Sequence, residues 1–162
     1  MKTLAYLSLG SNIGDREAHL RDAISRLEQH GQICAVSFFY ETEPVEFTEQ
    51  AWFLNCVATL ETSEAPTQLM ASLLTIEQEM GRRRVQKKGP RIIDIDILLF
   101  GDDIVNTPEL TIPHPAMAQR RFVLEPLAEI AADVQHPVLK KTIRELRDRF
   151  PKTQQVKPVS RG

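Results

Sequence analysis

The chain has 162 residues, of which 42% are hydrophobic and 26% are charged, and its formal net charge is -2 at pH 7. These values are typical of an ordinary globular protein, one long enough to bury roughly 70% of its unfolded surface in a single domain. The near-neutral balance excludes a global basic field for nucleic acid, so a site for an anion has to be local.

The N-terminal segment and the cysteines indicate the compartment. An apolar run over residues 4–9 stops at Gly10, which is too short for a signal sequence or a membrane span. Cys34 and Cys56 have no metal-ligand spacing and fall in apolar segments, so we expect both to be reduced core residues. We therefore predict a cytoplasmic chain in which residues 1–150 form one domain and residues 151–162 a frayed polar tail.

The hydrophobic pattern alternates between the two-residue period of strands and the 3.6-residue period of helices. Pro66 suits the first turn of a helix and Gly81 its end, and Thr142 with Glu145 forms a capping box. In chain order the predicted elements are a strand over 3–9, a helix over 16–29, strands over 33–40 and 52–60, a helix from Pro66 to Gly81, a strand over 92–100, a hairpin around Ile104 and 110–112, a helix over 122–132 interrupted at Pro126, and a helix from Thr142 through Phe150.

The core order is therefore strand–helix–strand–strand–helix–strand. This is the order of the ferredoxin-like βαββαβ folds. We predict an α+β protein with an antiparallel sheet and two helices on one of its faces. The later hairpin and helices are C-terminal additions to this core.

Two features between the second and third strands are unexpected. The connection over 41–51 is longer than a hairpin needs, and long loops in compact domains are often functional. Asn55 places a polar amide in the middle of an apolar strand. The amide is either a satisfied edge position or a donor–acceptor pair for a flat heterocycle.

The predicted strand over 92–100 carries two carboxylates on one face. Side chains alternate along a strand, so Asp94 and Asp96 share a face, while Ile93, Ile95, Ile97 and Leu99 share the other. Two residues span roughly 6.5 Å in a strand, and carboxylates about 5 Å apart repel by about 3 kcal/mol at an effective dielectric near 20. Mg²⁺, which takes one or two protein carboxylates together with water and phosphate, compensates that cost. The alternative is a solvent-facing strand, although Asp is depleted in strands.

A basic run precedes this strand: Arg82-Arg83-Arg84-Val85-Gln86-Lys87-Lys88, followed by Gly89-Pro90-Arg91. By itself such a run is typical of a solvated loop or a nucleic-acid patch. Next to a carboxylate pair it indicates a polyphosphate site, because Arg forks neutralise phosphate charge and carboxylates hold the metal ion.

These residues resemble the 6-hydroxymethyl-7,8-dihydropterin pyrophosphokinase family of the folate pathway, along nearly the whole chain. The family's diagnostic pattern is matched without a gap from Lys87 to Leu98, through Gly89-Pro90-Arg91 and Asp94-Ile95-Asp96. Supporting motifs are Leu9-Gly10-Ser11-Asn12, Phe53-Leu54-Asn55, Glu77 with Gly81-Arg82, Leu110-Thr111-Ile112-Pro113-His114, and Arg120 before Phe122.

The resemblance implies transfer of the β,γ-diphosphate of ATP to the pterin hydroxymethyl group, with release of AMP. It implies that Asp94 and Asp96 hold two Mg²⁺ ions and that Arg82 and Arg91 are catalytic. The implied ATP-binding residues are Glu77, Arg82, Arg84, Lys87, Lys88, Arg91, Ile97, Thr111, His114 and Arg120. The implied pterin-binding residues are Thr42, Pro44, Val45, Phe53, Asn55, Asp94 and Phe122. The implied partners are ATP and the pterin, with no nucleic acid and no membrane, and we expect a monomer.

Two positions depart from the pattern of the family. Some members have Trp where this chain has Lys88, and others have Arg-Gly where this chain has Arg120-Arg121. Two other functions stay open: a two-metal nucleotidyl enzyme of palm type, which would release pyrophosphate instead of AMP, and a ferredoxin-like RNA-binding module. The chain lacks the aromatic RNP pattern of RNA-recognition strands, and carboxylates on the sheet would repel a phosphate backbone.

Overall fold

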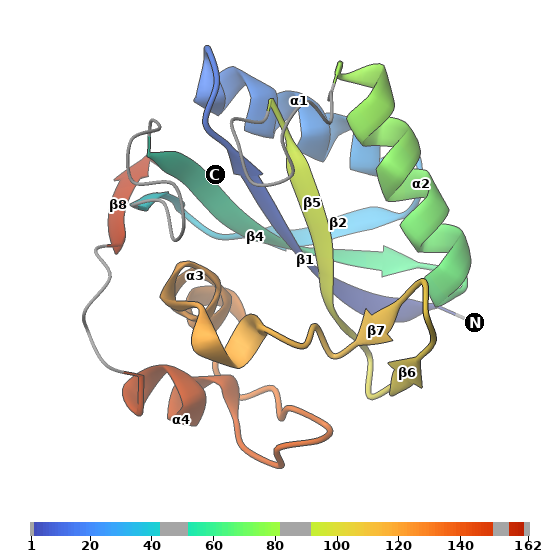
Figure 1. The fold of residues 1–162 in the computed structure, drawn as a ribbon, viewed down its shortest axis with the longest axis vertical. Coiled ribbons are helices and arrows are strands. Elements are labelled where there is room, and N and C mark those ends of the chain that lie inside the picture. Colours follow the sequence, from blue (N-terminus) through green and yellow to red (C-terminus); the bar gives the residue numbers. More distant parts are fainter. Residues whose placement is uncertain (1, 43–51, 82–91, 151–155, 161–162) are drawn as a thin grey trace.

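The computed structural model describes residues 2–42, 52–81, 92–150 and 156–160 (Figure 1). Its centre is an antiparallel sheet in which strands neighbour one another in the order β5-β1-β4-β3-β8, with β2 also pairing with β4. The strand bounds are Thr3–Ser11 for β1, Gln32–Val36 for β2, Phe39–Thr42 for β3, Phe53–Thr62 for β4, Asp94–Phe100 for β5 and Val156–Ser160 for β8. The long strands β1 and β4 form the middle of the sheet, so most of their residues are paired on both sides.

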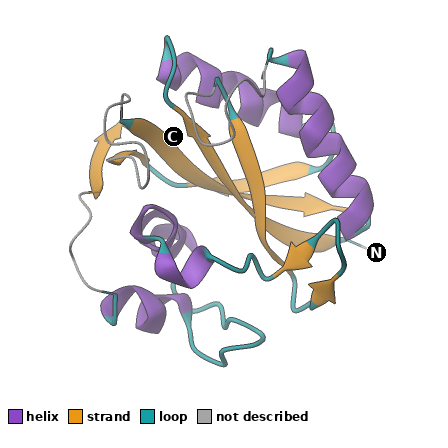
Figure 2. Ribbon diagram, in the orientation of Figure 1, coloured by secondary structure: helices purple, strands orange, loops and turns teal. Residues whose placement is uncertain are grey.

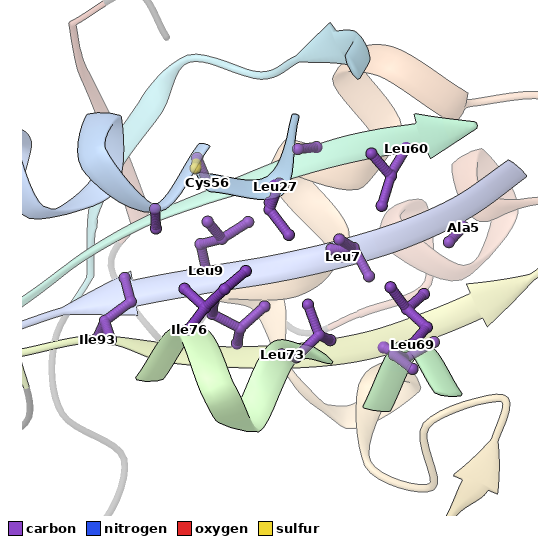
Figure 3. Packing of buried hydrophobic residues seen from close by; sticks show 14 of the residues in the cluster. Ala5, Leu7, Leu9, Leu27, Cys56, Leu60, Leu69, Leu73, Ile76 and Ile93 are labelled. Carbon is purple, nitrogen blue, oxygen red and sulfur yellow. The ribbon is translucent and has the colours of Figure 1, made fainter. Parts of the chain in front are cut away.

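Helices α1 (Arg16–Leu27) and α2 (Pro66–Glu79) pack on one face of the sheet (Figure 2). Asp15 caps α1 by accepting a hydrogen bond from the Ala18 amide, and Pro66 begins α2. Figure 3 shows their apolar side chains directed at Leu7 and Leu9 of β1. Each fully buried Leu or Ile stabilises the fold by roughly 1.5–3 kcal/mol, so this layer is the main hydrophobic core.

The segment after β5 covers part of the opposite face. It contains the hairpin β6 (Val105–Asn106) and β7 (Thr111–Ile112), the short 3-10 helix η1 (Met117–Gln119), α3 (Arg121–Ala131) and α4 (Ile143–Asp148). Leu124 and Leu127 of α3 are fully buried, and Leu127 packs with Tyr6 and Val57 of the sheet. The polar end of this sheet face carries the candidate site.

The predicted α+β class is confirmed, and so is the βαββαβ order when β2 and β3, which both pair with β4, are counted as its second strand. The predicted hairpin is confirmed as β6 and β7. The capping box is confirmed as well, because Thr142 and Glu145 each accept a hydrogen bond from the other's backbone amide at the start of α4. No helix in the described part of the chain is long and apolar enough to span a membrane.

The predicted strand over 33–40 is in fact two strands. β2 ends at Val36 and β3 begins at Phe39. Between them Ser37 donates its backbone amide to the Val57 carbonyl, but the Val57 amide bonds to Ser37 Oγ instead of a backbone oxygen. Because a side-chain oxygen replaces the backbone acceptor, the regular ladder of backbone hydrogen bonds is interrupted at Ser37. Both strands still pair with β4.

The predicted alternation along β5 is wrong beyond Ile97. Leu7 pairs with Ile97 and Tyr6 pairs with Leu99, so Leu98 is an extra residue on β5. Such a bulge reverses the faces of the residues after it. Phe100 therefore packs in the core under α1 and α2, whereas Leu99 lies in the cluster under α3.

Two expectations about the C-terminal part are also wrong. α3 continues through Pro126 without interruption. The lost hydrogen bond and ring clash cost about 3 kcal/mol, and burial of Val123, Leu124 and Leu127 at roughly 1.5–3 kcal/mol each exceeds that. The tail is not frayed along its whole length, since Val156–Ser160 forms β8 beside β3.

The cysteines occupy different environments. Cys56 is fully buried in β4, as predicted, and burial raises the pKa of its thiol well above the ordinary value. Cys34 is exposed on β2, so the expectation that it belongs to the core is wrong. Among the described strands β2 pairs only with β4, and the side chain of Cys34 lies on the solvent side of β2.

Candidate active site

Gly10 lies in the middle of a row of residues that crosses the sheet. It pairs with Asp94 of β5 on one side and with Asn55 of β4 on the other, and Asn55 pairs in turn with Tyr40 of β3. Opposed residues on antiparallel strands project to the same face. With strands about 4.8 Å apart, the backbones at Asp94 and Asn55 are about 10 Å apart. Gly10 adds no side chain of its own between them, and the Asn55 side chain lies against it.

Asp94 and Asp96 project from the edge strand β5 on this face. They lie opposite Gly10 and Ser8 of β1 in continuous register, so the prediction that the carboxylates share one face is confirmed. Both side chains are half-buried, while Ile93, Ile95 and Ile97 point into the core on the other side. The site therefore presents two carboxylates at the open edge of the sheet.

Glu77 supports this edge from behind. It lies in α2, its exposed fraction is only 3%, and its Oε2 accepts a hydrogen bond of 2.7 Å from the Ile95 amide. Ile95 stands between Asp94 and Asp96, and no described strand pairs with β5 on its outer side. The buried carboxylate thus satisfies an edge amide and fixes the stretch that carries both Asp residues.

On the other side of Gly10, Asn55 and Thr42 form a buried polar pair. Asn55 Nδ2 donates to Thr42 Oγ1, and both side chains are nearly inaccessible. Phe53 is half-buried on the same face of β4, two residues before Asn55. Amide, hydroxyl and aromatic ring are therefore adjacent, as recognition of a flat heterocycle requires.

His114 closes the site from the segment after β7. Its backbone amide donates to the carbonyl of the bulge residue Leu98 at 3.0 Å, and its Nδ1 accepts from the Ala116 amide at 3.1 Å. Burial, and then the positive charge of Arg120, lower the pKa of His114, whereas the charge of Asp94 opposes them. His114 is therefore neutral at pH 7, with its proton on Nε2.

Arg120 and Phe122 stand together where α3 begins. The guanidinium of Arg120 lies over the Phe122 ring, 5.5 Å from its centroid, in a cation–π contact. Phe122 packs against the cluster under α3. Thr111 lies in β7, exposed and opposite Asn106.

The remaining predicted residues are placed as follows. The side chain of Ile97 lies in the core under α1 and α2, facing away from Asp94 and Asp96, so its backbone alone is available on the site face. The predicted residues that fall outside the described part of the chain are Pro44, Val45, Arg82, Arg84, Lys87, Lys88 and Arg91.

The donor set fits a magnesium ion that is shared with phosphates. Asp94 and Asp96 supply two carboxylates, which is the number that Mg²⁺ takes when water and phosphate complete its octahedron. No group of three or more potential metal ligands occurs within residues 2–42, 52–81, 92–150 and 156–160. This arrangement does not suit a metal held by protein ligands alone.

Sequence reasoning missed the central role of Gly10. The residue reads as the start of a turn, yet β1 continues through it to Ser11. A glycine within a strand pattern often marks the close approach of another group, and that signal was present. Its pairing with both Asp94 and Asn55 depends on the order of strands, which no local pattern reveals.

Comparison with known proteins shows which family of proteins the chain is similar to. The sequence model of the 7,8-dihydro-6-hydroxymethylpterin-pyrophosphokinase (HPPK) family matches residues 6–132. The chain is 47% identical over 137 residues to the 2-amino-4-hydroxy-6-hydroxymethyldihydropteridine pyrophosphokinase of Bacillus subtilis, covering 83% of this chain and 82% of that protein. It is 42% identical over 142 residues to the Aquifex aeolicus protein of the same name, covering 88% of this chain and 89% of that protein.

Longer proteins contain a similar part. The chain is 45% identical over 134 residues to the folic acid synthesis protein fol1 of Pneumocystis carinii, covering 82% of this chain but 18% of that protein. The crystal structure of Plasmodium falciparum HPPK-DHPS with pteroate is similar with a TM-score of 0.75 at 19% identity, covering 91% of this chain and 42% of that chain. At this identity the likeness supports the fold alone.

The fold, the carboxylate pair and these matches define an enzyme, a pyrophosphokinase. More narrowly, the chain belongs to the HPPK family.

Proposed function

We propose that this site transfers pyrophosphate from ATP to the hydroxymethyl group of 6-hydroxymethyl-7,8-dihydropterin, a step of folate biosynthesis that releases AMP. The observation that carries the proposal is the row Asp94–Gly10–Asn55. It brings a carboxylate pair for a metal–phosphate group and an amide for a heterocycle within about 10 Å on one sheet face. A donor nucleotide and an acceptor pterin can therefore meet over Gly10.

The pterin side of the site binds and orients the acceptor. Asn55 and Thr42 offer an amide and a hydroxyl to the hydrogen-bonding edge of the pterin, and Phe53 and Phe122 offer aromatic faces for its ring. Burial makes this recognition selective, since a pterin lacking a matching group would leave unused the hydrogen-bonding capacity that the Asn55 amide retains beside its bond to Thr42. Pro44 and Val45, which lie outside the described residues, are proposed to add backbone contacts.

The nucleotide side holds the phosphates. Asp94 and Asp96 would hold Mg²⁺, which when bound neutralises phosphate charge and orients the group to be transferred. The Nε2–H of neutral His114 is available to donate to a phosphate oxygen, and Arg120 supplies a cation beside it. Glu77 and Thr111 are assigned to this side. Glu77 supports it by accepting the hydrogen bond of the Ile95 amide, which lies between the two Asp residues.

The basic residues Arg82, Arg84, Lys87, Lys88 and Arg91 lie outside the described part of the chain. We assign Arg82 and Arg91 to stabilisation of the transferring group, because a guanidinium fork matches phosphate geometry. The two lysines then contribute mainly to nucleotide affinity, as mobile point charges.

The test is product analysis with purified chain, Mg²⁺ and ATP. AMP should appear only when 6-hydroxymethyl-7,8-dihydropterin is added, in equal amount to the pterin diphosphate. Release of inorganic pyrophosphate in place of AMP would indicate the palm-type nucleotidyl reaction instead. ATP consumption that is indifferent to the pterin would overturn the proposal.

Three finer points belong to the proposal: two Mg²⁺ ions per ATP, a monomeric chain and a cytoplasmic location. Two ions match the needs of phosphoryl transfer, in which metal ions bridge phosphate oxygens. Calorimetric titration of Mg²⁺ into the complex with an unreactive ATP analogue measures the metal stoichiometry. Light scattering measures the mass in solution, and fractionation of source cells locates the chain.

A further inference from the structure

Arg16 joins the two strands that carry the pterin side of the site. It is the first residue of α1, and its guanidinium reaches two acceptors far away in the sequence. Nη1 donates to the backbone carbonyl of Trp52 at 2.8 Å, and Nη2 donates to Glu41 Oε2 at 3.0 Å. Glu41 lies in β3 and Trp52 directly precedes β4, so one side chain connects both strands.

The position of these acceptors in the strand register is what matters. Thr42 of β3 pairs with Phe53 of β4, and this is the last pair in their register. Glu41 precedes Thr42 in the chain, and Trp52 precedes Phe53. Arg16 therefore holds the Trp52 backbone and the Glu41 side chain, next to the pair whose side chains face the proposed pterin position.

The contact differs from the other ion pairs of α1. The side chains of Arg16 and Glu41 are 28% and 32% exposed, whereas Arg21 and Glu17, one turn apart on the same helix, are 48% and 47% exposed. Exposed pairs within a helix contribute little. A partly buried, charge-assisted pair between separate elements fixes geometry more firmly.

Arg16 is itself held in place from the β1 side. The chain runs from Gly10 through a turn in which Gly14 has a φ of +66°, and Asp15 then caps α1 through the Ala18 amide at 3.1 Å. The guanidinium thus starts from an element connected directly to β1. The contact therefore fixes the position of Thr42 and Phe53 relative to Gly10, which forms the floor of the site.

We propose that Arg16 is a positioning residue for the acceptor subsite, which sets the distance of Thr42 and Phe53 from the floor at Gly10. The inference rests on the proposed function. It predicts a selective effect, because Asp94 and Asp96 are fixed independently, by pairing with β1 and by Glu77. Loss of Arg16 should affect the pterin and leave the nucleotide side intact.

The test compares Arg16→Met with Arg26→Met. Arg26 lies in the same helix, is 34% exposed and bonds to Asp22 and Glu79, away from β3 and β4. Calorimetry would measure the affinity for the pterin in the presence of an unreactive ATP analogue, and the affinity for the analogue alone. Thermal unfolding would be followed for each variant.

Arg16→Met should weaken pterin binding about tenfold. Without the two charge-assisted hydrogen bonds of Arg16, part of the binding free energy would be used to order Thr42 and Phe53. Affinity for the ATP analogue should stay within about twofold, because Asp94 and Asp96 are held by β1 and Glu77 without any contact to Arg16. The KM for the pterin should rise while kcat at saturating pterin changes less. Arg26→Met should alter neither affinity.

Glu41→Gln is the milder variant if Arg16→Met does not fold. In this variant Arg16 keeps its bond to the Trp52 carbonyl and loses only the charge of its second partner, so pterin affinity should fall about threefold. Unchanged pterin affinity in a folded variant, or equal weakening of both ligands, would overturn the role of Arg16. Failure of the unmodified chain to bind the pterin would instead overturn the proposed function.

Discussion

The backbone of Gly10 approaches the side chain of Asn55 so closely that a Cβ atom at Gly10 would lie 2.5 Å from Asn55 Oδ1. The same atom would also come within 3.4 Å of Phe53 Cδ1. Glycine is thus required here for space, because β1 keeps its pairing with both neighbours through this residue. Two of the groups assigned to the pterin rest against this one backbone position.

Gly10→Ala should therefore displace the Asn55 amide. We expect the affinity for the pterin to fall at least about tenfold and the free energy of unfolding to fall by about 1–3 kcal/mol, the usual cost of overpacking. Gly31→Ala is the matched control, because its Cβ would meet the Glu61 carbonyl oxygen at the far end of β4. That variant should lose stability without a selective loss of pterin affinity. Equal pterin binding by both variants would contradict the role of Gly10.

Asp94→Asn and Asp96→Asn test the metal pair. Each removes a ligand and also relieves like-charge repulsion, so turnover should collapse while thermal stability without Mg²⁺ stays equal or rises slightly. Steady-state AMP formation and thermal unfolding with and without Mg²⁺ are the measurements. Asp103→Asn, in the exposed turn after β5, is the control and should keep full activity. Near-normal turnover in either site variant would refute the metal assignment.

Glu77→Ala tests the support behind β5. It should lower the free energy of unfolding by roughly 1–3 kcal/mol, because the buried Ile95 amide loses its acceptor. Glu77→Gln keeps an oxygen for that amide, so its stability should lie closer to the unmodified chain. Denaturant unfolding measures both, with Glu79→Ala, 56% exposed on the same helix, as the neutral control. A stable Glu77→Ala variant would show that the contact is dispensable.

His136 should make stability depend on pH. Burial lowers its pKa below the ordinary 6.5, and its Nδ1 accepts from the Val138 and Leu139 amides. The unfolded chain then binds the proton more readily. The contribution of His136 is complete above pH 6.5 and is lost as the pH falls through that value toward the lower folded pKa.

The measurement is the melting temperature between pH 8 and pH 5, for the unmodified chain and for His136→Asn. Asn supplies an uncharged acceptor and does not titrate, so its melting temperature should fall less on acidification. An identical pH dependence of the two proteins would exclude His136 as the origin. Nuclear magnetic resonance titration of the imidazole checks the direction of the pKa shift independently.

Deletion of residues 151–162 tests β8. Its backbone bonds to β3 contribute about 0.5–1.5 kcal/mol each, but ordering a strand costs about 1–2 kcal/mol per residue, so the two terms nearly cancel. We expect global stability to change by about 1 kcal/mol or less while amide exchange in residues 39–42 rises clearly. Residues 58–60 of β4, paired on both sides, serve as the internal control. Unchanged exchange in β3 would show that β8 does not protect it.

The sequence by itself determined most of the elements and the shared face of Asp94 and Asp96 on the site strand. Two-residue alternation put Asp94 and Asp96 on one face, and the capping box at Thr142 marked the start of α4. These features depend on groups within a few residues of one another, so local stereochemistry decides them. The βαββαβ order follows from the same local periods.

The tertiary structure decided the features that depend on partners distant in the sequence. Leu98 becomes a bulge because of its register against β1, and Ser37 breaks a strand because its hydroxyl bonds to Val57. β8 forms because β3 leaves an edge open to it, and Gly10 becomes the floor of the site because β1 lies between β4 and β5. Strand order and register are set by contacts between whole faces of the sheet, and a single strand pattern is compatible with several neighbours.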